Sequence, residues 1–171
     1  PDTGRDACAT NPCQSVAKKN AFATSYYQAG AERADRVRRL FTKIARRYDL
    51  INDLQSAGMH RLWKRRLISS LLIRPNDRVL DLACGSGDLA YRVLQKQPAA
   101  RVIGGDFTFS MLTVARARER LLRPLHPKLS NQHSALSTQL AWLNLDALVM
   151  PFASETFDAV MMAYGLRNMA D

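Results

Sequence analysis

The chain of 171 residues is long enough for one domain with a substantial core, and its hydrophobic content of 47% argues against a disordered protein. Its longest apolar runs, such as AVMMAYGL at 159–166, are too short to cross a bilayer, and residues 1–20 lack the apolar stretch of a signal peptide. The chain has three cysteines, an odd number that cannot all pair in disulfides, and this favours a reducing compartment. The histidines are not spaced from the cysteines as the ligands of a metal site usually are, so we predict no metal site.

The net charge of +10 is unevenly distributed along the chain. Residues 1–78 contain 16 Lys/Arg against 7 Asp/Glu, whereas residues 79–171 contain 9 against 8. A basic first half suggests an anionic partner, either nucleic acid or a membrane surface. A solvated helix face explains the same charges equally well.

The first half of the chain is predicted to be helical after a flexible start. Residues 1–30 are polar and are expected to form a flexible N-terminal segment. Apolar residues then recur at helical spacing over 37–48, and a second helix pattern runs from about 60 to 72, with Gly58 interrupting the chain between them. We expect 31–73 to be a helical segment on the substrate or membrane side.

Strands and helices alternate in the rest of the chain, 74–171. Strands are predicted at 79–83, 101–106, 141–146 and 157–166, the last covered on both faces, with helices at about 89–94 and 111–122 and a loop at 123–139. This order predicts an α/β fold, a Rossmann-like doubly wound sheet.

The stretch VLDLACGSGDLA (79–90) joins the first strand to its helix and contains G-x-G-x-x-G/A at Gly85, Gly87 and Ala90. Asp81 and Asp88 flank this loop, and two unit charges about 4 Å apart interact by roughly 1 to 4 kcal/mol. Both acids should therefore disfavour a pyrophosphate and favour a cationic ligand. Asp81, Asp106 and Asp146 end three of the predicted strands, which indicates a ligand site at that edge of the sheet.

S-adenosylmethionine fits these requirements. Its ammonium and sulfonium suit nearby acids, and loop amides can receive its carboxylate. Asp106 follows the loop by roughly 20 residues, the offset of the ribose-binding acid in dinucleotide folds, so its carboxylate can accept from both ribose hydroxyls. Asp146 can receive the adenine amino group.

Five segments carry a resemblance to one family: FTKIARRYDLINDLQSAGMHRLWKRRL (41–67), LDLACGSGDLA, DFTFSML (106–112), LDALVMPF (145–152) and FDAVMMAYGLRNMAD (157–171). Over about 36–171 the chain resembles the ubiquinone/menaquinone biosynthesis C-methyltransferases, which belong to the class I S-adenosylmethionine-dependent methyltransferases. The resemblance implies cofactor binding at the loop and strand ends. The expected cofactor-binding residues are Asp81, Gly85, Ser86, Gly87, Asp106, Asp146, Ala147 and Ala163.

The resemblance also implies a lipophilic quinol substrate with an isoprenoid tail, methylated on a ring carbon. We expect Arg167 to stabilise the phenolate and Asn168 to position water, because Arg is a poor base. A structural ion pair is the alternative for Arg167. The sequence does not distinguish a benzoquinol from a naphthoquinol ring.

The expected location is cytoplasmic and peripheral to the inner face of the cell membrane, where the basic first half contacts anionic lipid. Nucleic acid is not expected as a partner, and a homodimer is left open. The family's sheet has seven strands and four are counted here, so we expect the chain to be incomplete at its C-terminus and inactive alone. An RNA methyltransferase and a non-catalytic cofactor-binding scaffold subunit are the alternative functions.

Overall fold

The computed structural model describes residues 31–122, 139–165 and 169. The predicted N-terminal segment 1–30 and the predicted loop 123–139, apart from its last residue, lie outside them. Among the described residues, three helices and a short 3-10 turn precede the sheet: α2 Ala31–Ile44, η1 Ala45–Arg47, α3 Tyr48–Ser56 and α4 Met59–Ser70. Gly58 separates α3 from α4 as predicted, with a left-handed φ of 78°.

The single helix predicted over 37–48 is wrong in one respect, because the 3-10 turn η1 divides it and α3 begins at Tyr48. The apolar stripe continues across the turn, with Ala45 buried inside it. Periodicity alone therefore gives no sign of the break.

The four predicted strands form one parallel sheet of order β3-β2-β1-β4, and the predicted fold class is confirmed. The strands are β1 Arg78–Leu82, β2 Arg101–Asp106, β3 Leu140–Asn144 and β4 Ala159–Met162. Helix α5, Asp88–Lys96, connects β1 to β2, and α6, Phe109–Leu122, follows β2. The chain turns to opposite sides of β1 to form β2 and β4, so a topological switch point lies at β1.

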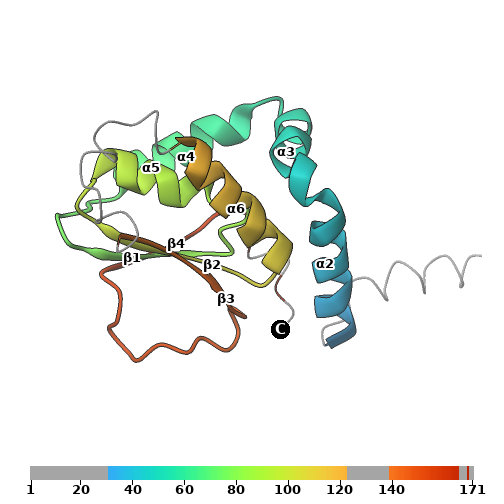
Figure 1. The fold of residues 1–171 in the computed structure, drawn as a ribbon. Coiled ribbons are helices and arrows are strands. Elements are labelled where there is room, and N and C mark those ends of the chain that lie inside the picture. The colour runs from blue at the N-terminus through green and yellow to red at the C-terminus, as the bar shows by residue number, and fades with distance from the viewer. Residues whose placement is uncertain (1–30, 123–138, 166–168, 170–171) are drawn as a thin grey trace, which may run out of the picture.

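The two faces of β1 belong to different hydrophobic clusters because side chains alternate along a strand. Val79 packs in the cluster under α4 and α5, whereas Leu80 and Leu82 pack in the second cluster with Phe152 and Phe157. Figure 1 shows α4, α5 and α6 over one face of the sheet and the segment between β3 and β4 passing on the other. Asp81 shares the face of Val79 and is 1% exposed.

The predicted fourth strand is too long and too buried. β4 covers only Ala159–Met162, and Val160 is 56% exposed. The apolar run has the length of a longer strand, but Tyr164 adopts a left-handed φ of 60° just beyond β4, which a continuing strand does not allow. Because the run is apolar throughout, its composition does not reveal which face is exposed.

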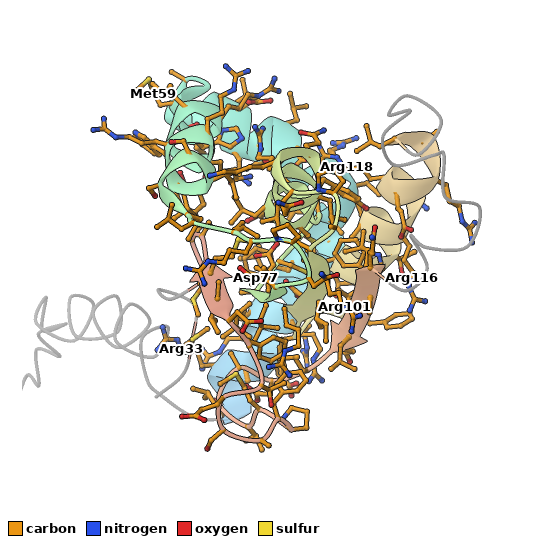
Figure 2. The ribbon with its side chains drawn as sticks, turned by 90° about the vertical axis from the view of Figure 1, so that its left-hand side faces the viewer. Arg33, Met59, Asp77, Arg101, Arg116 and Arg118 are labelled. Carbon is orange, nitrogen blue, oxygen red and sulfur yellow. The ribbon has the colours of Figure 1, made fainter. Side chains whose placement is uncertain are left out.

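Helices α3 and α4 leave several large apolar side chains exposed, and Met59 projects outward at the start of α4 (Figure 2). These residues are Leu50, Leu54, Met59, Leu62 and Trp63. Among the described residues, no helix is both long enough and apolar enough to cross a membrane.

Candidate functional site

A pocket lies at the carboxyl edge of the sheet, where parallel strands of this class of fold bind ligands. The ends of β1 and β2 and the segments that follow β3 and β4 contribute to it, and α2 lines one side with Ala34, Val37 and Phe41. Five of the predicted cofactor-binding residues line this pocket: Gly85, Asp106, Asp146, Ala147 and Ala163. Their roles toward a cofactor remain predictions.

Asp106 is the most constrained acid on the pocket wall. Its Oδ2 accepts from the Gly85 N–H at 2.8 Å, and its Oδ1 accepts from the Thr108 N–H at 2.8 Å. Burial raises the pKa of Asp106 above its usual 3.8, although these two amide donors oppose the shift. Each carboxylate oxygen retains further capacity to accept, so the group can still bind two hydroxyls.

The glycine loop packs tightly on itself and on its neighbours. The Gly85 and Gly87 N–H groups donate within the protein, to Asp106 and to the Cys84 carbonyl. These two amides are therefore already used, and the expectation that loop amides receive the ligand's carboxylate does not hold for them. Gly87 has a left-handed φ of 76°, and a Cβ there would lie 2.4 Å from the Trp142 ring.

Asp81 lies behind the loop and not on the described pocket wall. Its Oδ2 accepts from the Ala90 N–H at 3.1 Å, on the helix-covered face of the sheet. Burial raises the pKa of Asp81 from 3.8 to about 8, against the effects of the Ala90 N–H and Lys64. Asp81 is therefore mostly protonated at neutral pH, and its cofactor-binding role stays a prediction.

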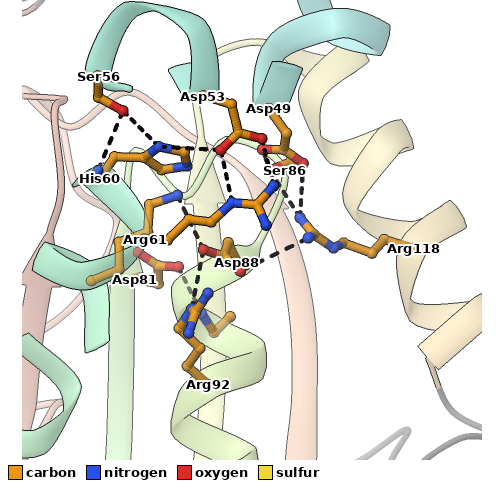
Figure 3. A network of polar contacts seen from close by, with 12 residues as sticks. Asp49, Asp53, Ser56, His60, Arg61, Asp81, Ser86, Asp88, Arg92 and Arg118 are labelled. Carbon is orange, nitrogen blue, oxygen red and sulfur yellow. Dashed lines mark hydrogen bonds and ion pairs between the residues drawn. The ribbon is translucent and has the colours of Figure 1, made fainter. Parts of the chain in front are cut away.

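Asp88, at the start of α5, carries a compensated charge. Its carboxylate lies 3.1 Å from both Lys64 Nζ and Arg92 Nε, and 3.9 Å from Arg118 (Figure 3). Burial opposes ionisation, but Lys64 and Arg92 outweigh it and hold the pKa of Asp88 below its usual value. Neither Asp81 nor Asp88 presents an unbalanced charge to the pocket, contrary to the expectation that both repel a phosphate there.

Ser86 and Gly87 also lie outside the described pocket wall. The Ser86 hydroxyl is turned toward the N-terminal helices, where it donates to Asp49 Oδ1 at 2.8 Å. Its contact with a cofactor stays a prediction, as does that of Gly87. The predicted catalytic residues Arg167 and Asn168 lie outside the described residues.

Asp146 and Ala147 reach the pocket from a different place than expected, because β3 ends at Asn144 and not at Asp146. The Asn144 amide donates to the Asp106 carbonyl at 2.7 Å, and Asp146 Oδ1 accepts from the Leu148 N–H at 2.9 Å. Asp146 therefore sits in a turn beyond the strand, where its carboxylate caps the backbone.

Sequence reasoning did not identify Tyr48 or Phe41 as site residues. Both rings line the pocket and pack edge to face with centroids 5.8 Å apart. The available signal was the helical stripe over 37–48, which indicated a buried face without indicating what that face covers.

The sequence is similar to several quinone-pathway methyltransferases. It is 38% identical over 138 residues to the ubiquinone/menaquinone biosynthesis C-methyltransferase UbiE of Cereibacter sphaeroides, covering 81% of this chain and 50% of that protein. It is 40% identical to UbiE of Stenotrophomonas maltophilia, covering 84% and 52%. It is 36% identical to the mitochondrial 2-methoxy-6-polyprenyl-1,4-benzoquinol methylase of Caenorhabditis elegans, covering 81% and 45%. The chain thus spans about half the length of the curated relatives it matches.

Solved structures support the fold. A Methanococcus maripaludis protein described as an S-adenosyl-L-methionine-dependent methyltransferase aligns with a TM-score of 0.52 at 18% identity, covering 73% of this chain and 51% of that one. The YcgJ protein of Bacillus subtilis aligns with a TM-score of 0.50 at 22% identity, covering 63% and 40%. The sequence profile of the ubiE/COQ5 methyltransferase family matches residues 29–171, and the chain therefore belongs to that family.

Proposed function

We propose that the protein carrying this chain transfers a methyl group from S-adenosylmethionine to a ring carbon of a polyprenylated quinol in ubiquinone or menaquinone biosynthesis. Membership of this methyltransferase family identifies S-adenosylmethionine as the cofactor. The substrate class is inferred from relatives named as quinone C-methyltransferases and a benzoquinol methylase. The family match over 29–171 is the observation that carries the proposal.

The residues of the pocket fit an adenosyl group. Asp106 offers a carboxylate with free lone pairs, while Met111 and Leu145 offer apolar walls for a flat ring. Gly85 lies on this wall beside Tyr48 and Met111, each of which would be 3.4 Å from a Cβ placed on it. We assign Asp106 to the ribose hydroxyls and the Asp146-Ala147 pair to the adenine.

When bound, the cofactor supplies a methyl group on positively charged sulfur. The chain's own residues must then hold the quinol ring in line with that methyl, exclude water and stabilise the phenolate that makes the ring carbon nucleophilic. We assign phenolate stabilisation to Arg167 and water positioning to Asn168. These two roles rest on their position in the GLRN segment.

We also assign the basic residues of 33–66 to an anionic lipid surface, where a polyprenylated substrate is found. Lys64 must be removed from this set, because it is 7% exposed and pairs with Asp88. Arg39, Lys43, Arg46 and Arg47 are exposed, as are Arg65 and Arg66. The exposed apolar side chains of α3 and α4 add a second component to such a contact.

One experiment tests the proposed reaction. The whole protein is incubated with methyl-labelled S-adenosylmethionine and, in separate reactions, a short-chain benzoquinol, a short-chain naphthoquinol or bulk RNA. We expect the label on a ring carbon of a quinol. Label on RNA would favour the alternative enzyme class, and cofactor binding without transfer to any acceptor would favour a scaffold subunit.

A further inference from the structure

The Ser86 hydroxyl ties the glycine loop to the N-terminal helices through the carboxylate of Asp49, in α3. Ser86 in the loop is 2% exposed, and its Oγ donates to Asp49 Oδ1 at 2.8 Å. Arg118 of α6 donates to the other oxygen of Asp49 at 3.0 Å, and it also reaches Ser86 Oγ at 3.4 Å. Figure 3 shows Asp49, Ser86 and Arg118 meeting where α3, the loop and α6 converge.

The residue before Asp49 forms part of the pocket wall. Tyr48 lines the pocket and lies against the loop, since a Cβ on Gly85 would be 3.4 Å from the Tyr48 Cε1 atom. Tyr48 in turn packs against Phe41 of α2. Fixing Asp49 to Ser86 therefore fixes the aromatic part of the wall at a defined distance from the loop.

Stability alone gives a weak reason for this arrangement. The Asp49 and Arg118 side chains are 43% and 33% exposed, and ion pairs with that much solvent contribute little to folding. Their geometry is nevertheless specific, because the two oxygens of one carboxylate bind two different elements. Such an arrangement restricts where α3, the glycine loop and α6 lie relative to one another more than it increases the free energy of unfolding.

We propose that Asp49 and Arg118 are positioning residues that hold the wall formed by Tyr48 and Phe41 against the glycine loop, and so set the affinity of the pocket for the cofactor. This inference rests on the proposed function, because it takes the pocket to be the cofactor site. Neither residue lines the described pocket wall, so they act through Ser86 and Tyr48.

The test compares Asp49→Ala, Ser86→Ala and the double variant in the whole protein, with S-adenosylhomocysteine affinity measured by calorimetry. Losing a hydrogen bond to a charged group should weaken binding roughly ten-fold in Asp49→Ala. The double variant should bind about as weakly as the weaker single variant, because both substitutions remove the same contact. Asp49→Asn should bind with intermediate affinity, because it keeps an acceptor for Ser86 but not the charge for Arg118.

Two control variants separate positioning from general destabilisation. Asp53→Asn breaks the α3–α4 ion pair with Arg61 without touching the glycine loop. Arg116→Ala removes an exposed arginine from the same helix as Arg118 (Figure 2). Both controls should bind the ligand within two-fold of wild type, and turnover at saturating cofactor should change by less than about three-fold in Asp49→Ala.

The outcomes are distinguishable. If wild-type protein binds no S-adenosylhomocysteine, the proposed function itself fails. If wild type binds but Asp49→Ala binds within two-fold of it, or Asp53→Asn loses as much affinity, the positioning role is rejected. Independent, multiplicative losses in the double variant would reject it as well.

Discussion

Three aspartates near the glycine loop lie in three different environments. Asp106 faces the pocket with a pKa raised by burial, Asp81 is buried behind the loop with a pKa raised to about 8, and Asp88 is ion-paired with cations that hold its pKa low. Of the cations beside Asp88, Arg92 lies one turn further along α5, whereas Lys64 and Arg118 come from α4 and α6. The motif could be predicted from sequence, but the full charge that it presents could not, because distant segments supply part of it.

Asp106→Ala should weaken cofactor binding strongly. Losing a charged acceptor for two hydroxyls removes on the order of 1.5–3 kcal/mol, which is about a ten- to hundred-fold loss of affinity. Calorimetry on the whole protein measures it. Asp106→Asn is the companion variant, because it keeps the size of the side chain but retains an acceptor oxygen for only one of the two N–H groups, Gly85 or Thr108, that Asp106 binds. Wild-type affinity in both variants would reject the ribose-binding role.

Asp81→Asn should change how stability depends on pH. The folded-state pKa of Asp81 is about 8 and its usual value is 3.8, so the folded protein binds one more proton than the unfolded chain between these values. The free energy of unfolding therefore falls as pH rises through this window, by an amount on the order of a few kcal/mol. Asn keeps the acceptor for Ala90 and does not titrate.

Urea unfolding at pH 5 and pH 8 measures this difference. Wild type should lose more stability than Asp81→Asn between the two values, since other titrating groups contribute equally to both proteins. Parallel losses in the two proteins would show that Asp81 is ionised in the folded state.

At the scale of elements, β3 supports the glycine loop through one side chain. The Trp142 ring lies close to Gly87 and Gly104, and its Nε1 donates to Glu119 of α6 at 3.0 Å. Tyr91 of α5 packs against the same ring with centroids 5.7 Å apart. The indole thus requires glycine at two positions, one in the loop and one in β2.

Gly104→Ala should destabilise the protein by about 1–3 kcal/mol, because the new Cβ would lie 2.4 Å from the Trp142 ring. Chemical denaturation measures the loss. Trp142→Leu is expected to destabilise by itself through lost packing, but combining it with Gly104→Ala should cost less than the sum of the two. Simple additivity would mean that the cost of the new methyl group does not come from Trp142 but arises at another neighbour, such as Cys84 Sγ, which lies 3.2 Å from the same Cβ.

The elements themselves were largely predictable, and their ends were not. The strands β1 and β2 and the helices α5 and α6 follow from strong local patterns, such as the buried run at β1. The turn η1 and the short extent of β4 were missed, because both depend on tertiary packing across an uninterrupted apolar pattern. The role of α2 as a pocket wall is equally non-local.

At the scale of the whole molecule, exposed basic residues still form a basic surface on the N-terminal helices when the buried and ion-paired cations are left out. Lys64 is buried, and Arg61 is bound to Asp53. Arg39, Lys43 and Arg46 are exposed and recur at intervals of three to four residues, which places them on one side of the helical segment formed by α2 and η1. Arg47 is exposed beside them.

The whole protein should sediment with anionic vesicles and dissociate as salt rises. Each basic residue near an anionic surface contributes roughly 1 kcal/mol, and the attraction decays within a Debye length of about 8 Å at physiological salt. Replacing Arg39, Lys43, Arg46 and Arg47 by alanine should therefore weaken binding by at least ten-fold.

A matched variant replaces Arg74, Arg101, Arg116 and Arg120, four exposed arginines outside α2–α4, and changes the net charge equally. If position matters, this variant should bind vesicles more tightly than the first one. Equal losses in the two variants would mean that the vesicles respond only to the net charge of the protein.

Binding that persists at high salt would instead assign the contact to the exposed apolar side chains Leu54, Leu62 and Trp63, because apolar burial is not screened by salt. Equal binding to neutral and anionic vesicles at low salt would show that the basic residues do not contact lipid and only face solvent.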